Sequence, residues 1–260
     1  MSYLNDLFSL DGKVAVAIGA GGVLAGAMAE ALGAAGARVA VLDLNGEAAD
    51  ERAADIRDRL GVDALGMAID ATSEEDLRKA LGQILSLWGR VDVLLNAPGI
   101  NSGTPFFEIT EEEWNRILSV NLTSMFLACQ VFGGDMVERG EGGSIINISS
   151  ASSGPPLSKV FTYSITKAGV NNLTQFLARE WAPQGVRVNA LAPGFFPAEQ
   201  NRKLLTEERT ATIMAHTPMA RFGEAEELAG ATVWLASESA SGFVTGAIIR
   251  VDGGFTAMTI

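Results

Sequence analysis

Short apolar runs that alternate with longer segments of helical character are the feature that most restricts how this chain can fold. The first two runs are KVAVAI at 13 to 18 and RVAVLD at 38 to 43, and both are too short for helices. The length and the β-branched residues of the second run are typical of a buried strand. Between them lies VLAGAMAEALGAAG, whose small residues are typical of a helix packed closely on a sheet. Strand, glycine turn, helix and strand together predict a βαβ unit with two parallel strands.

The same alternation continues to the end of the chain. Further strands are expected at 64 to 69, 91 to 95, 144 to 148, 186 to 192 and 246 to 251. Helices are expected at 46 to 60, 74 to 88, between 111 and 139, from Tyr163 to about 182, and near 200 to 215 and 224 to 236. Crossover helices cover both faces of such a sheet. The fold class is therefore α/β, a Rossmann-like doubly wound domain with seven mainly parallel strands. Because no linker or repeat interrupts it, we expect one domain over 1–260, with a substrate loop at about 194–216.

Composition and charge exclude several classes of protein. With 260 residues and 48% hydrophobic content, the chain can bury one large core. Its net charge of −12 opposes binding to nucleic acid or to an anionic membrane. Cys129 and His216 are the single residues of their types, so no zinc cluster is expected, although composition leaves carboxylate-bound magnesium open. No catalytic metal is expected. No apolar run reaches the length of a membrane span and no signal peptide is recognisable, so a cytoplasmic protein is expected.

The first βα turn and the next two strand ends are candidates for a nucleotide site. Glycines at 19, 21, 22 and 26 allow backbone N–H groups and a helix N-terminus to approach a pyrophosphate, although glycine also serves tight turns and close packing. Asp43 ends the second strand, where a carboxylate accepts both ribose hydroxyls and repels a 2′-phosphate, which favours NAD over NADP. Its alternative role is a helix N-cap or turn residue. Asp70 is a candidate for the adenine edge, or a cap for the helix that starts at Ser73.

A tyrosine and a lysine four residues apart suggest carbonyl chemistry. Tyr163 and Lys167 belong to YSITK, at the start of a helical pattern, so both side chains lie on one helix face. A neighbouring ammonium favours the phenolate and lowers the pKa of a phenol toward a useful range. Such a pair is common by chance, and its meaning depends on the residues around it.

Those residues occur in the order and spacing of the short-chain dehydrogenase/reductase family, which the chain resembles over about 13 to 256. The matching stretches are the glycine turn, Asp70, NAPG at 96 to 99, Asn121 in SVNL, Ser150 in NISS, YSITK, PG at 193 to 194 and VDGG at 251 to 254. The resemblance implies that Tyr163 is the general acid/base while hydride passes between substrate and nicotinamide. It further implies that Lys167 lowers the pKa of Tyr163 and holds the nicotinamide ribose, and that Ser150 positions the substrate oxygen.

Asn121 is expected, by the same resemblance, to hold a water that links Lys167 to solvent, with a helix cap as the alternative. Ser149 and Ser150 could both be strand-end hydroxyls, but only Ser150 has the family's spacing to Tyr163. The resemblance also implies a set of cofactor contacts. These are Gly19, Gly22, Val23, Leu24, Asp43, Asp70, Ala71, Asn96, Pro98, Tyr163, Lys167, Pro193, Gly194 and Phe196.

The chain departs from the family pattern at several of these positions. The usual glycine turn, TGxxxGxG, has Ile18, Val23 and Ala25 where threonine and two glycines stand, so the loop is expected to follow a different path supported by its other glycines. Pro98 lacks an N–H near the cofactor, and Ala198 replaces the usual threonine after the PG motif. Weaker cofactor binding is the expected consequence, with the chemistry retained.

The substrate loop resembles a subgroup of fructuronate or D-mannonate oxidoreductases. In PGFFPAEQNRKLL, the side chains of Gln200, Asn201 and Arg202 suit a carboxylate and hydroxyls, which favours a sugar acid or polyol. Phe195 and Phe196 favour an apolar wall instead. The alternatives are an NADP-linked reductase of 3-oxoacyl groups or apolar ketones, and a non-catalytic nucleotide-binding protein. The resemblance also implies a homotetramer, assembled through the helices at 111 to 139 and 163 to 182 and the last strand.

Overall fold

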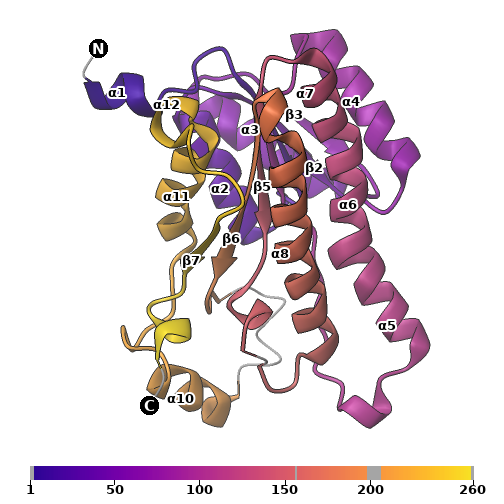
Figure 1. The fold of residues 1–260 in the computed structure, drawn as a ribbon, viewed down its shortest axis with the longest axis vertical. Coiled ribbons are helices and arrows are strands. Elements are labelled where there is room, and N and C mark those ends of the chain that lie inside the picture. The colour runs from indigo at the N-terminus through magenta and orange to yellow at the C-terminus, as the bar shows by residue number, and fades with distance from the viewer. Residues whose placement is uncertain (1–2, 156, 198–205, 259–260) are drawn as a thin grey trace.

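A seven-stranded parallel sheet forms the centre of the molecule (Figure 1). The computed structural model describes residues 3–155, 157–197 and 206–258. The sheet order is β3-β2-β1-β4-β5-β6-β7, and every neighbouring pair is parallel. The strands are β1 Val14–Ile18, β2 Arg38–Asp43, β3 Ala64–Ala68, β4 Val93–Asn96, β5 Gly143–Ile148, β6 Val186–Pro193 and β7 Ile248–Val251. The predicted Rossmann-like domain is confirmed, and the strand order reverses direction between β1 and β4, where such folds bind ligands.

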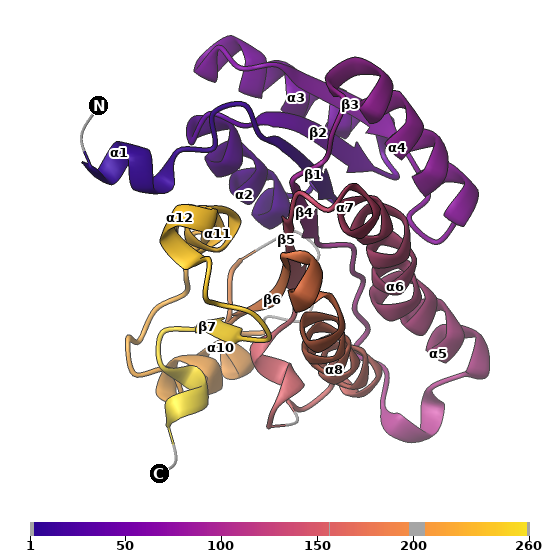
Figure 2. The same ribbon diagram turned by 45° about the horizontal axis from the view of Figure 1, so that its top comes forward.

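Helices cover both faces of the sheet (Figures 1 and 2). One face carries α2 Val23–Ala34, α3 Gly46–Leu60 and α11 Ala229–Ala236. The other carries α4 Glu74–Trp88, α5 Glu111–Leu118, α6 Ser124–Ala128, α7 Gly134–Arg139 and α8 Phe161–Trp181. Alternate residues of β1 enter the two cores, Ala15 and Ala17 on one side and Val14 and Val16 on the other, because strand side chains alternate. Three other helices of the described residues lie at the periphery: α1 Tyr3–Phe8, α10 Glu207–Ala215 and α12 Glu238–Ser241.

Local sequence sets the ends of several helices. The side chains of Asn45, Ser73, Thr110 and Thr206 accept backbone N–H bonds at the starts of α3, α4, α5 and α10. Each such cap stabilises its helix by about 1 kcal/mol. α3 and α4 both end at a glycine in the left-handed conformation, as a helix C-terminus favours.

The helices expected between 111 and 139 form one continuous helical run, because two π turns, Ser119–Thr123 and Cys129–Gly133, join α5, α6 and α7. Its most apolar 18-residue window has a mean hydropathy of 1.4, so by length and composition alone the run is long and apolar enough for a membrane span, and the expectation that no apolar run reaches that length is wrong. Half of its most apolar window is nevertheless buried in the domain, against α4 and α8. Cys129 is buried here, as predicted.

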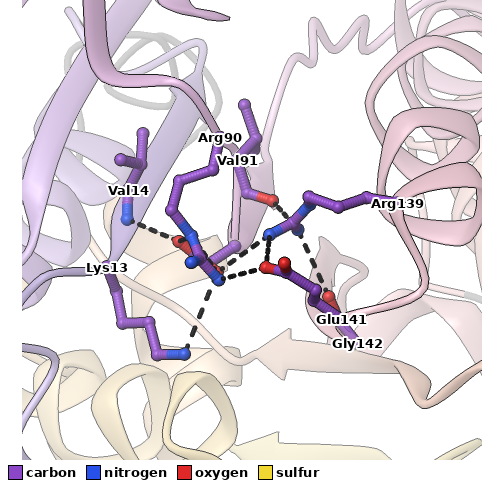
Figure 3. Close-up of polar contacts among 8 residues, drawn as sticks. Lys13, Val14, Arg90, Val91, Arg139, Glu141 and Gly142 are labelled. Atoms are coloured by element: carbon purple, nitrogen blue, oxygen red, sulfur yellow. Dashed lines mark hydrogen bonds and ion pairs between the residues drawn. The ribbon is translucent and has the colours of Figure 1, made fainter.

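Charged side chains tie three strands together at the amino edge of the sheet (Figure 3). Asp92 is buried and accepts a hydrogen bond from the backbone N–H of Val14 at 3.0 Å. Arg90 donates to the same carboxylate, and Arg139 and Lys13 form ion pairs with it at 3.5 and 3.9 Å. Burial by itself raises the pKa of Asp92, but the bonds from Arg90 and Val14 outweigh it and hold that pKa below its usual value. Lys13, Arg90 and Arg139 precede β1, β4 and β5, so this charged cluster lies at the amino edge of the sheet. A ligand site is therefore expected at the opposite edge, where the strands end.

Candidate active site

A cavity of about 680 Å³ lies at the carboxyl edge of the sheet. It extends from the ends of β2 and β3, past the ends of β1 and β4, to the ends of β5 and β6. Most of the predicted site residues line it: Gly19, Gly22, Val23, Leu24, Asp43, Asp70, Ala71, Pro98, Ser150, Tyr163, Lys167, Gly194 and Phe196. One continuous space therefore connects the predicted nucleotide residues with the predicted catalytic residues.

The glycine turn brings the N-terminus of α2 to the cavity wall. Gly19 has φ +78°, and a Cβ there would lie 3.1 Å from the carbonyl of Ala97, so both its conformation and its space require glycine. Gly22 is the N-cap of α2, and within the described residues no side chain caps this helix. Val23 is already the first helical residue and needs no positive φ, which explains how the turn accommodates it. The unpartnered amides of the first turn fit an anion such as a pyrophosphate.

Asp43 links the glycine turn to the turn after β2 through its two carboxylate oxygens. Oδ2 accepts from the backbone N–H of Gly21 at 3.0 Å, and Oδ1 accepts from that of Asn45 at 3.0 Å. A Cβ on Gly21 would lie only 3.0 Å from this carboxylate, so a larger residue there would crowd the contact. The N-cap of α3 is Asn45, and the alternative prediction that Asp43 caps this helix is therefore wrong.

Asp70 likewise does not cap α4, because Ser73 does. Its Oδ1 accepts from the backbone N–H and the hydroxyl of Thr72 at 2.8 and 2.6 Å. This side chain thus shapes the wall of the cavity at the end of β3.

Ser150, Tyr163 and Lys167 lie together at the other end of the cavity. Lys167 is buried, its Nζ donates to the carbonyl of Ile148 at 2.7 Å, and it lies 5.5 Å from the ring centroid of Tyr163. Burial lowers the pKa of Lys167 to about 7. Burial also raises the pKa of Tyr163, and a hydrogen bond with Ser150 acts in the opposite direction. The expected lowering of the Tyr163 pKa by Lys167 is therefore not found, because desolvation disfavours the charged form of both groups.

Asn121 lies inside the first π turn and is fully buried. Its Oδ1 accepts from the N–H of Ile100 at 2.7 Å, and its Nδ2 donates to the carbonyl of Ile100 at 2.8 Å and to Thr166 Oγ1 at 3.3 Å. The alternative prediction of a helix cap is wrong, since the residue is in mid-helix. Asn121 instead fixes the segment after β4 that forms one wall of the cavity. The hydroxyl of Ser149 donates to the carbonyl of Lys167 at 3.3 Å, which leaves Ser150 as the serine on the cavity.

Two of the predicted cofactor contacts, Asn96 and Pro193, do not line the cavity. Asn96 is fully buried behind the cavity, where its Nδ2 donates to the carbonyl of Met125 at 3.1 Å and to Asn147 Oδ1 at 3.2 Å. Pro193 lies within β6, paired with Val251, and does not line the cavity. Both residues belong to strands and make contacts with neighbouring strands of the sheet. The predicted substrate residues Gln200, Asn201 and Arg202, and Ala198, lie outside the described residues.

The apolar wall expected from Phe195 and Phe196 lies at the substrate end of the cavity. Beside it are side chains that the sequence did not point to: Leu157, Val160 and Phe222 extend the apolar wall, and Arg209 of α10 supplies a cation. No motif marks these residues, because they meet only when α10 folds back toward the loop before α8. Among the described residues, no group of three or more His, Cys, Asp or Glu side chains could hold a metal ion.

Comparisons with known proteins agree with this geometry. Residues 19–256 match the family model described as enoyl-(acyl carrier protein) reductase. The chain is 40% identical to "Uncharacterized oxidoreductase UxuB" of Bacillus subtilis (strain 168) over 96% of both chains. It belongs to the short-chain dehydrogenase/reductase family. It is also 37% identical to the 5-keto-D-gluconate 5-reductase of Escherichia coli (strain K12), over 96% of this chain and 98% of that protein.

A solved relative has the same fold over its entire length. It is a gluconate 5-dehydrogenase from Burkholderia cenocepacia J2315 in complex with NADP and tartrate, with a TM-score of 0.93 and 33% identity, and the match covers 99% of this chain and 100% of that one. As a short-chain dehydrogenase/reductase, this protein is an enzyme of the class that acts on CH–OH groups with a nicotinamide cofactor.

Proposed function

We propose that this short-chain dehydrogenase/reductase interconverts the secondary alcohol and ketone of a sugar acid or polyol, with NAD(H) as its cofactor. The observation that carries the proposal is the single cavity that joins Asp43 at one end to Ser150 and Tyr163 at the other. A dinucleotide is long enough to need both ends. Two relatives are named as a 5-keto-D-gluconate 5-reductase and a gluconate 5-dehydrogenase, which supports a sugar acid as the substrate class.

The proposed preference for NAD rests on the charge at the end of β2. The cationic side chains on the described cavity wall are Lys167 and Arg209, which come from α8 and α10 rather than from the neighbourhood of Asp43. A 2′-phosphate beside Asp43 would meet a carboxylate without a compensating cation, whereas ribose hydroxyls could donate to that carboxylate. NADP in the Burkholderia relative makes this a point to test.

The proposed chemistry divides among three side chains. When bound, the nicotinamide supplies or accepts the hydride. Ser150 orients the substrate oxygen, and Tyr163 gives that oxygen a proton during reduction and takes it during oxidation. Lys167, whose pKa is about 7, can exchange a proton near neutrality and hold the ribose. Both Nδ2 protons of Asn121 are already donated, to Ile100 and Thr166, so the relay water proposed for this residue would bind the second lone pair of Oδ1 or the backbone.

One observation favours a second candidate, an NADP-linked reductase of 3-oxoacyl groups or apolar ketones. Leu157, Val160, Phe195 and Phe222 would suit an apolar chain. A screen of initial rates separates the two functions. D-gluconate and D-glucitol would be offered with NAD⁺ or NADP⁺, and 5-keto-D-gluconate, fructuronate, 3-oxoacyl thioesters and apolar ketones with NADH or NADPH. Turnover confined to the thioesters or apolar ketones would overturn the proposed substrate class, and NADPH preferred over NADH would overturn the proposed cofactor.

We further propose a cytoplasmic homotetramer, since a dissociable cofactor requires the cytoplasmic pool. Apolar side chains on the outer faces of α6 and α8 support the assembly: Phe126, Ile165 and Phe176 are 43%, 39% and 56% exposed in the single chain. Light scattering on the purified protein should give four times the mass of one chain. Phe176→Asp should lower that mass, and a monomeric wild-type protein would contradict the proposed assembly.

A further inference from the structure

We propose that Arg209 binds the carboxylate of the substrate, so that the enzyme selects polyhydroxy acids over neutral polyols. This inference rests on the proposed alcohol and ketone chemistry at Ser150 and Tyr163. It adds that the positive charge of Arg209, at the substrate end of that site, determines which substrates bind.

Two contacts fix Arg209 on the cavity wall. Thr206 caps α10 by accepting from the N–H of Arg209 at 3.2 Å, which sets the direction of the first helical turn. The guanidinium then donates from Nη2 to the carbonyl of Ser158 at 3.1 Å and from Nη1 to Ser158 Oγ at 3.4 Å. Ser158 lies between Leu157 and Val160, which line the same cavity as Tyr163. The cation is thereby held where α10 meets the loop before α8.

The positive charge of Arg209 has no acidic partner within the described residues. Glu207 and Glu208 precede it directly on α10, at spacings that do not bring side chains face to face. The cavity carboxylates, Asp43 and Asp70, follow β2 and β3, on the far side of the sheet from β6 and α10 (Figure 2). An anion at the substrate end would therefore be drawn to Arg209.

The remaining donors of Arg209 suit a carboxylate. A guanidinium has five N–H groups, and the bonds to Ser158 use two, which leaves three in a planar fork. Phe195 and Phe222 line the cavity with it, and apolar walls strengthen an ion pair by excluding water. Hydroxyl and amide groups of Ser150, Ser152 and Asn101 also line the cavity and can meet substrate hydroxyls. A molecule with one carboxylate and several hydroxyls matches this set.

D-gluconate and D-glucitol are matched probes, because they differ only in a carboxylate or a CH2OH group at C1. Calorimetric titration of each into protein saturated with NADH measures binding without turnover. We expect the wild-type protein to bind gluconate roughly 10- to 100-fold more tightly, as a charge-assisted bond predicts. Arg209→Gln should remove this preference and change glucitol affinity by less than about 3-fold. Arg209→Lys should keep part of it, since the charge remains without the fork.

The control is Ser158→Ala, which deletes the longer bond to Arg209 and keeps the carbonyl acceptor. Its gluconate preference should persist, and melting temperatures would verify that all variants fold. Two results would overturn the inference: a wild-type protein without preference, or an Arg209→Gln variant that weakens both ligands equally, as loss of a purely structural contact would. Gluconate binding that depends on Arg209 without NAD-linked turnover would instead refute the proposed function and leave this inference standing.

Discussion

Replacing Asp43 with asparagine tests the cofactor proposal, because the change removes a charge and keeps the shape. A 2′-phosphate carries about two negative charges, and at about 5 Å each would meet Asp43 with roughly 0.8 kcal/mol of repulsion in water and roughly 3 kcal/mol at an effective dielectric constant of 20. The total is about 1.7 kcal/mol at least, so the wild-type protein should bind NADH at least ~15-fold more tightly than NADPH. Asp43→Asn should reduce this ratio to near one.

The variant should also lose some stability. Asp43 accepts from both Gly21 and Asn45, whereas an amide offers one acceptor oxygen, so one of these bonds is lost at a cost of about 1 kcal/mol. For a chain of this size, that lowers the melting temperature by about 2–4 °C.

Fluorescence titration with NADH and NADPH, at two salt concentrations, gives both affinities and the electrostatic share of their ratio. Asp70→Asn is the matched control, since it removes the same charge from the cavity at the end of β3 and should alter the ratio much less. A wild-type protein that binds NADPH as tightly as NADH would refute the reasoning. The reasoning would also be refuted if the ratio of NADH to NADPH affinity were the same in Asp43→Asn as in the wild-type protein.

Three further predictions concern stability and reactivity. Asp92→Asn should lower the free energy of unfolding by roughly 3 kcal/mol, because it removes the buried charge on which Arg90 and Arg139 converge and leaves Glu141 as their remaining partner. Since the pKa of Asp92 is lowered in the folded state, denaturant titrations should show this difference in full above about pH 4 and shrinking as pH falls through the folded pKa; a difference independent of pH would contradict it. Gly19→Ala should lower the free energy of unfolding by roughly 2 kcal/mol and weaken NADH binding. Gly82→Ala, in α4 with open space around it, should instead raise the free energy of unfolding by up to ~1 kcal/mol in the same denaturant titrations. Burial raises the pKa of Cys129 to about 12, so a thiol reagent at pH 8 should label it only after unfolding, and rapid labelling of the native protein would show that this core is open.

The fold could be predicted because the relevant signals are local. Apolar runs of four to eight residues, followed by helical patterns, place all seven strands, and the end of each strand places Asp43, Asp70 and Ser150 at one edge. Spacing within a single helix likewise places Tyr163 near Lys167.

What could not be predicted depends on contacts between distant segments. Asn96 belongs to the NAPG motif, which predicts a cofactor contact. Its side chain is instead oriented by hydrogen bonds to Met125 and Asn147 on neighbouring elements. Arg209 reaches the cavity only through Ser158, which lies 51 residues earlier in the chain. The pKa of Tyr163 depends on burial by the whole fold, which no spacing of four residues reveals.

The most direct test of the proposed mechanism is the turnover of Tyr163→Phe. This variant removes the hydroxyl that transfers the proton and keeps the ring beside Lys167. NAD⁺-linked oxidation of the best substrate should fall by roughly 10²- to 10⁴-fold in kcat, with the NADH dissociation constant changed by less than about 3-fold. Wild-type turnover in this variant would contradict the account.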